Sequence, residues 1–186
     1  LEDRFFLFEK YCFPSIKNQI NRNFIWFVLF DTQTPEKYRK RIIGYQQILA
    51  QFVPLYIPDG LYPALSEAIN KAMVDYLQEG DRYVITTRID NDDTFHRNMI
   101  DEVQSRFNHQ NNIFLNFNNG FQYDVEKEIL VKMKYINNHF ITRIEKRNAL
   151  VETVITYNHA LINEIAEILY IENKEPLWIE IIHNGN

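Results

Sequence analysis

Apolar positions recur along the chain with two different periods, and the two periods alternate. Phe24 to Phe30 is an uninterrupted apolar run rich in aromatic and β-branched residues, which is typical of a strand covered on both faces. Glu36 to Phe52 carries apolar residues on one face and Lys37 to Arg41 largely on the other, which is typical of an amphipathic helix. The same periods predict further strands at 53–57, 83–87, 113–117, 120–123, 129–135, 153–156 and 178–182. They predict further helices at 3–21, with a kink or break at Pro14, and at 61–78, 94–108 and 159–168.

Strand and helix alternate three times in the first half of this pattern. Such alternation implies crossover connections and a mostly parallel sheet with helices on both faces. The late strands follow one another closely, which indicates antiparallel additions at one end of the sheet. Because no internal repeat or long linker interrupts the chain, we expect a single α/β domain over residues 1–186.

The composition fits a packed globular protein and excludes several functional classes. The chain is 46% hydrophobic and has a formal net charge of −5, so no strong basic field exists that would hold a nucleic acid. The five glycines are too far apart for a phosphate-binding loop. The single cysteine, Cys12, excludes an internal disulfide and fits a cytoplasmic protein. We expect no transmembrane segment, because the longest apolar run falls far short of the about 20 residues that span a bilayer.

The most informative segment is Thr86 to Thr94, which carries three carboxylates at the end of a predicted buried strand. Carboxylates this close repel one another and stabilise no core, and ligands of open α/β sheets bind at this edge. Asp90 and Asp92 offer the hard oxygen ligands that Mg²⁺ or Mn²⁺ prefers. The alternative is that Asp92 or Asp93 only caps the helix that is expected to follow.

Three other residues merit attention as candidates. Asp31 lies at the same edge if its strand is parallel, where it would either contact a base or ribose or begin a turn. His183 ends the last predicted strand, as a turn residue or as a ligand of a metal or diphosphate. Cys12 lies among phenylalanines on an apolar helical face, which predicts a buried, inert thiol.

Four segments of the chain carry a family resemblance. They are FEKYCFPSIKNQ (8–19), FIWFVLFDTQTP (24–35), ITTRIDNDD (85–93) and WIEIIHNGN (178–186). In this order they resemble the putative rhamnosyltransferase family of bacterial proteins, and the R-x-D-N-D-D and W…H-x-x-N blocks are the most specific parts. The family is similar to inverting glycosyltransferases of the GT-A class. The resemblance therefore implies a GT-A-like three-layer sandwich with a mostly parallel central sheet.

The resemblance also implies an activity and its partners. The expected enzyme transfers a sugar from a nucleotide-diphospho-sugar donor, such as dTDP-rhamnose, to a glycan acceptor with inversion. Residues about 1–117 would form the nucleotide-sugar-binding half and about 118–186 the acceptor-side half. Such a protein would work in the cytoplasm, at the periphery of the inner membrane.

The resemblance assigns roles to the residues singled out above. Mn²⁺ or Mg²⁺ would be held on the diphosphate by Asp90, Asp92 and His183. The donor would contact Arg88 and the remaining carboxylates of the strand ends. The full set expected to bind the donor is Asp31, Arg88, Asp90, Asp92 and Asp93.

An inverting transfer also requires a carboxylate or histidine that takes the proton of the acceptor hydroxyl. Glu145, Glu152 and Asp124 lie in the second half, where GT-A acceptor sites usually are, and Glu145 is the first choice. GT-A proteins normally begin with a strand, whereas this chain starts directly in its first helix, so we expect the sheet to lack that strand. Two alternative functions are a non-catalytic GT-A-like carbohydrate-binding or scaffold module and a metal-dependent nucleotidyl or phosphoryl transferase.

Overall fold

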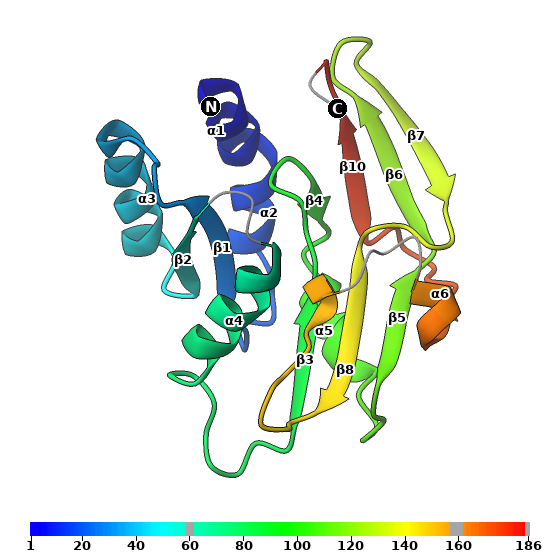
Figure 1. Cartoon of the computed structure of the whole chain (residues 1–186). Helices are drawn as coiled ribbons and strands as arrows, with labels where there is room; N and C mark the ends of the chain where they lie inside the picture. Colours follow the sequence, from blue (N-terminus) through cyan, green and yellow to red (C-terminus); the bar gives the residue numbers. More distant parts are fainter. Residues whose placement is uncertain (59–61, 157–161, 185–186) are drawn as a thin grey trace.

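Helices flank a set of short strands in the computed structural model of the chain (Figure 1), which describes residues 1–58, 62–156 and 162–184. The helical segments are α1 (Glu2–Leu7), η1 (Phe8–Cys12), α2 (Phe13–Lys17), α3 (Glu36–Ile48), α4 (Tyr62–Met73), α5 (Met99–Ser105), η2 (Val154–Thr156) and α6 (Ile162–Ile165). The strands are β1 (Trp26–Asp31), β2 (Phe52–Ile57), β3 (Tyr83–Thr87), β4 (Thr94–Phe95), β5 (Ile113–Phe117), β6 (Asn119–Asp124), β7 (Ile129–Lys134), β8 (Ile141–Lys146), β9 (Glu167–Ile171) and β10 (Trp178–Ile182). Hydrogen bonds group these strands into sheets with the orders β1-β2, β4-β10-β6-β7 and β3-β8-β5-β9.

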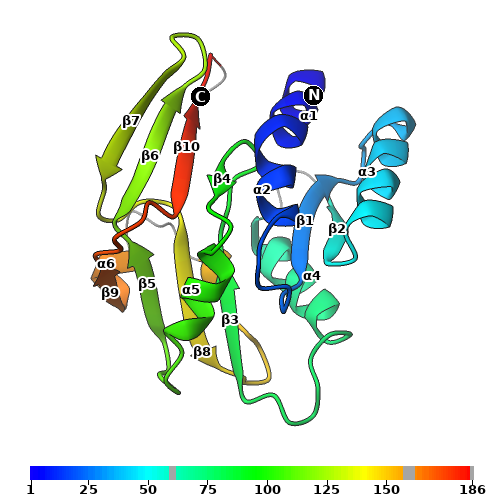
Figure 2. The same ribbon diagram turned by 180° about the vertical axis from the view of Figure 1, so that it is seen from behind.

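The long apolar run of the sequence forms β1, which is covered by helices on both faces as predicted. β1 pairs in parallel with β2, so that Trp26 lies opposite Phe52. Trp26 and Val28 pack with the cluster that contains η1 and α3, whereas Phe27 packs with the cluster that contains α4. Figures 1 and 2 show this layering from opposite sides, with α4 on one face of β1 and α1, η1 and α2 on the other.

The other two sheets are mixed, so the prediction of a mostly parallel sheet is wrong. β8 runs antiparallel to both β3 and β5, and β9 pairs in parallel with β5. In the third sheet β10 is parallel to β6 and antiparallel to β4, while β7 is antiparallel to β6. The sequence pattern missed β8 because all of its residues except the last are buried, so no alternation of polar and apolar positions marks it. The chain is thus an α/β protein with mixed sheets.

Tertiary pairing also shortens two predicted helices. The helix predicted at 94–108 is confined to α5, because Thr94 and Phe95 pair with β10 instead. The helix predicted at 159–168 is reduced to α6, and its end belongs to β9; positions 157–161 lie outside the described residues. The strand predicted at 153–156 is wrong, because η2 forms a 3₁₀ turn there. No break occurs at Pro14, which lies in the first turn of α2; the helix changes from the π-helical turn η1 to α2 just before it and stays helical.

One buried cluster joins the beginning of the chain to its end. It extends from Phe5 in α1 through Ile42 in α3 to Trp178 in β10. The indole Nε1 of Trp178 donates a hydrogen bond of 2.7 Å to the carbonyl oxygen of Phe117. Its ring lies so close to Gly120 that an added Cβ would overlap it. This close approach fixes β10 against β6, and the position of β10 in turn places His183 at its carboxyl end.

Within the described parts of the chain, no helix has both the length and the apolar character that a membrane crossing requires.

Candidate functional site

The aspartate cluster follows β3 directly and lies at one end of a cavity of about 1000 Å³. The backbone turns sharply here, with the N–H of Asp93 donating to the carbonyl oxygen of Asp90 at 3.3 Å. The turn directs the three carboxylates towards different neighbours. The cluster therefore does not form a single site, and each carboxylate has its own partners.

Asp90 is paired with Arg88, which lies two positions before it. Nε of Arg88 donates to Oδ1 of Asp90 at 3.0 Å, and Nη2 donates to Oδ2 at 3.2 Å. Both side chains remain partly exposed and line the cavity. This two-point contact fixes the carboxylate of Asp90 and places a guanidinium in the wall of the cavity.

Asp92 links three distant parts of the chain. Its Oδ2 accepts a bond from Nη1 of Arg4 in α1 at 2.8 Å and lies 3.0 Å from Nε2 of His183, just beyond β10. Asp92 is buried, whereas the side chain of Arg4 is 48% exposed. The sequence pattern gave no sign of Arg4, because its contact with Asp92 spans 88 positions.

Asp93 is buried and holds His139, a histidine that follows β7 and precedes β8. Oδ2 of Asp93 lies 2.7 Å from Nε2 of His139, and Oδ1 accepts the N–H of Ile181 at 2.8 Å. Burial lowers the pKa of His139, but the hydrogen bond with Asp93 and its charge outweigh burial, so the pKa of His139 is raised. The sequence pattern does not single out His139, because the contact with Asp93 spans 46 positions and depends on the unpredicted strand β8 that follows it.

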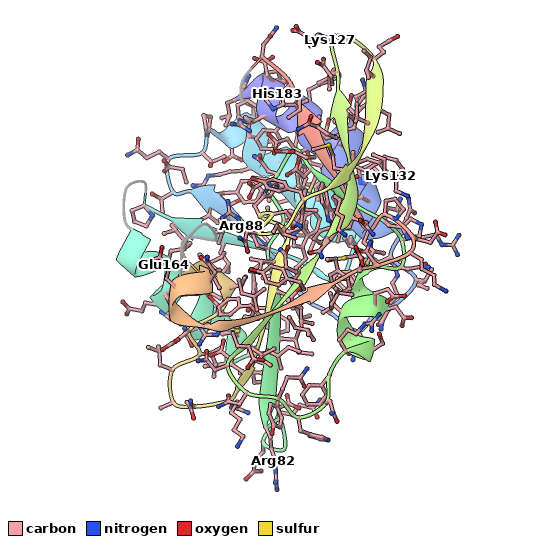
Figure 3. All side chains as sticks on the ribbon, turned by 90° about the vertical axis from the view of Figure 1, so that its right-hand side faces the viewer. Arg82, Arg88, Lys127, Lys132, Glu164 and His183 are labelled. Atoms are coloured by element: carbon pink, nitrogen blue, oxygen red, sulfur yellow. The ribbon has the colours of Figure 1, made fainter. Side chains whose placement is uncertain are left out.

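The predicted metal ligands are divided between two places in this arrangement. Asp90, Asp93 and His139 each offer a ligand atom, and these atoms lie within 4.8 Å of one another. Asp92 instead belongs to a separate group, in which it contacts both His183 and Arg4. In Figure 3 His183 lies towards the tip of the β6–β7 hairpin, whereas Arg88 lies near the middle of the molecule. Two carboxylates and an imidazole make a ligand set that suits Mn²⁺ or a similar divalent cation.

Asp31 is the last residue of β1, and it accepts hydrogen bonds within the turn that follows. This turn is the alternative to a contact with the donor that was considered from the sequence. The Oδ1 of Asp31 accepts the N–H of Gln33 at 2.6 Å, and its carbonyl oxygen accepts the hydroxyl of Thr34 at 2.7 Å. Asp31 is not among the residues that line the cavity. The geometry thus favours the turn over a contact with the donor.

Glu145 lies in β8 and is buried with its carboxylate bound to the backbone. The oxygens accept the N–H groups of Glu152 at 3.1 Å and Thr153 at 2.9 Å, and one lies 3.7 Å from Nε of Arg143. Glu145 does not line the cavity. This placement gives Glu145 an anchoring role for the segment after β8, and it does not favour the predicted role as the proton acceptor.

Cys12 is fully buried in η1, as predicted. Burial, followed by the negative charges of Asp93, Asp92 and Asp90, raises the pKa of its thiol well above the ordinary value. Its Sγ lies 3.5 Å from the carbonyl oxygen of Asp90, so the thiol packs beneath the cluster. The prediction of a buried thiol with no nucleophilic character therefore agrees with the structure.

Comparison with protein families gives one match. The model of the family described as "Putative rhamnosyl transferase" matches residues 1–186, which is the whole chain. Among curated proteins, none matches the chain.

Proposed function

The chain belongs to the putative rhamnosyl transferase family, and we propose that it transfers a deoxyhexose from a nucleotide-diphospho-sugar donor, such as dTDP-rhamnose, to a glycan acceptor with inversion. One observation carries the proposal. Arg4, Arg88 and the Asp90–Asp93–His139 group all line the same cavity at the carboxyl end of β3. An anionic ligand and a divalent cation can both be held there, which is what a nucleotide-diphospho-sugar requires.

Different residues of the site would bind the diphosphate and the cation. The guanidinium of Arg4 is half-exposed and that of Arg88 is partly exposed, and both now pair with carboxylates and can turn to phosphate oxygens. Asp90, Asp93 and His139 would hold the cation, and Asp93 also fixes the ring of His139. When bound, Mn²⁺ or Mg²⁺ would offset the negative charge that develops on the departing nucleoside diphosphate. We place the site in a GT-A-like fold on the strength of the family.

A calorimetric titration tests this proposal. The chain is titrated with dTDP, UDP and GDP, each with and without Mn²⁺, and Asp90→Asn is compared with Asp75→Asn. Asp75 is an exposed aspartate outside the cavity, so its variant controls for the loss of one negative charge. We expect one nucleotide to bind in the presence of Mn²⁺, and its affinity to fall by about tenfold or more in Asp90→Asn alone.

Two results would contradict the proposal. One is nucleotide binding that is unchanged by chelation and by Asp90→Asn, which would show that no cation takes part in nucleotide binding. The other is binding of glycan with no binding of any nucleotide, which would indicate a carbohydrate-binding module in place of a transferase.

A further inference from the structure

The sheet that contains β6 and β10 has an open edge at β7. β7 ends the order β4-β10-β6-β7, where its neighbour is β6. In the described part of the chain no strand lies along its other edge, and Figure 1 shows β7 on the outside of the molecule. The N–H of Tyr135 donates to Asn118, on the β6 side, at 2.8 Å. Because these groups alternate along a strand, the N–H and carbonyl groups of Leu130 and Lys132 point away from β6.

Apolar side chains are exposed on both faces of β7. Ile129, Leu130 and Val131 follow one another, and their exposed fractions are 50%, 52% and 47%. Successive side chains of a strand point to opposite faces of the sheet, so this exposure affects both faces. An open strand edge that carries exposed apolar residues is a template for pairing with another strand.

Charged residues of opposite sign border this apolar stretch at its two ends. Glu126 and Glu128 precede it, Lys132 and Lys134 follow it, and all four are exposed. Lys127, which also precedes it, is paired with a neighbouring aspartate, and Lys134 is paired with a glutamate just after β9. Among the residues that the structure describes, Glu128 and Lys132 form no ion pair. The stretch therefore has an acidic amino end and a basic carboxyl end.

We propose that β7 pairs antiparallel with β7 of a second copy of this chain, about a two-fold axis at Leu130. Leu130 then lies opposite Leu130 of the second copy, and Ile129 lies opposite Val131. Glu128 lies opposite Lys132, and the two-fold axis repeats each of these contacts. A parallel arrangement would place lysine beside lysine, which is unfavourable. The interface uses β7 of both copies, so the pairing closes at two copies.

The charges select a second copy over a lipid surface as the occupant of this edge. The chain has a formal net charge of −5, and glutamates border the apolar stretch, so an anionic membrane would repel it. A second copy instead brings a basic end to each acidic end. No residue of β7 lines the cavity beside the aspartate cluster, so the pairing leaves that site open. This inference does not rest on the proposed function.

Sedimentation velocity over a range of protein concentrations tests the proposal. We expect the 186-residue chain to show a monomer–dimer equilibrium. The dissociation constant should rise by about tenfold or more in Glu128→Lys and in Lys132→Glu, because each variant places like charges opposite one another twice. The double variant Glu128→Lys/Lys132→Glu exchanges the two charges and should restore most of the affinity. Glu79→Lys, at an exposed position between α4 and β3, controls for the same change of charge.

Hydrogen exchange gives a second readout that needs no variant. We expect the amides of Leu130 and Lys132 to exchange more slowly as the protein concentration rises, because the second copy pairs them. The amide of Tyr135 is already bonded to Asn118, so its exchange should not depend on concentration.

Three outcomes overturn the proposal. Sedimentation as a monomer at every concentration would show that β7 does not pair with itself. A dimer with the same affinity in all variants would place the interface elsewhere. A monomer that binds vesicles containing phosphatidylglycerol, and loses this binding in Lys132→Glu, would assign the apolar stretch to a lipid surface. Nucleotide binding is measured separately, so a failure here is distinguishable from a failure of the proposed function.

Discussion

At the scale of single residues, the site is built from charge pairs that differ in burial. The pair of Arg4 and Asp92 joins a half-exposed guanidinium to a buried carboxylate, whereas Asp93 and His139 are both largely enclosed. Solvent screens the half-exposed guanidinium of Arg4, and Asp92 keeps His183 as a second partner, so loss of the Arg4 contact should cost little stability, about 0–1 kcal/mol. Arg4 is therefore available to bind ligand, while Asp93 serves to position His139.

Replacement of Arg4 tests this division. In Arg4→Gln we expect the affinity for the nucleoside diphosphate to fall by about tenfold, because a charge-assisted contact with phosphate is lost. The thermal midpoint should stay close to that of the unaltered chain. Arg106→Gln is the control, since Arg106, just after α5, forms an exposed pair with Glu102 and does not line the cavity. Titration calorimetry and thermal melting measure both properties, and a large loss of stability in Arg4→Gln would instead assign Arg4 to the fold.

Replacement of Glu145 separates anchoring from catalysis. Glu145→Gln keeps the shape of the side chain but replaces one carboxylate oxygen with an NH₂ group. An NH₂ group cannot accept a hydrogen bond, so the backbone N–H of either Glu152 or Thr153 loses its acceptor. We expect a loss of about 1–3 kcal/mol in the free energy of unfolding, measured by urea denaturation, with nucleotide binding unchanged. Loss of sugar transfer at unchanged stability would restore Glu145 as the proton acceptor.

At the scale of elements, the sequence pattern marks some strands clearly, such as β3, and does not mark others, such as β8. β3 has the predicted bounds because β-branched residues flanked by charge mark it clearly, and the aspartates beyond it were found from their mutual repulsion alone. β8 was missed because burial on both faces removes the period of two, and His139 was missed with it. Asp31 and His183 were placed correctly at strand ends, but which partner each would take depends on long-range contacts.

The contact of β6 with β10 provides a test at this scale. Gly120→Ala places a methyl group into the ring of Trp178, which is buried and held by its hydrogen bond to Phe117. We expect a loss of stability of about 1–3 kcal/mol or more, as for other overpacked cores. Gly44→Ala is the matched control, because a Cβ there meets nothing within 4 Å in α3 and should stabilise by about 0.5–1 kcal/mol. Urea denaturation compares the two, and equal stabilities would contradict the packing described for Trp178.

At the scale of the whole molecule, one cavity is lined by parts of α1, β3, the segment before β8 and Glu180 of β10. Sequence periodicity predicted the α/β class and most of the elements, because these depend on local patterns. It could not predict the mixed sheets or the meeting of Asp90, Asp93 and His139, because both depend on pairings between distant strands. We propose above all that these three residues form the cation site of a nucleotide-sugar transferase.

The most direct test is electron paramagnetic resonance of Mn²⁺ binding in the presence of dTDP, with His139→Gln compared with His183→Gln. We expect the Mn²⁺ affinity to fall by about tenfold or more in His139→Gln and to stay nearly unchanged in His183→Gln. Thermal melting of both variants confirms that each is folded. Loss of Mn²⁺ binding in His183→Gln with retention in His139→Gln would contradict this assignment. The ligands would then be Asp90, Asp92 and His183, as expected from the sequence.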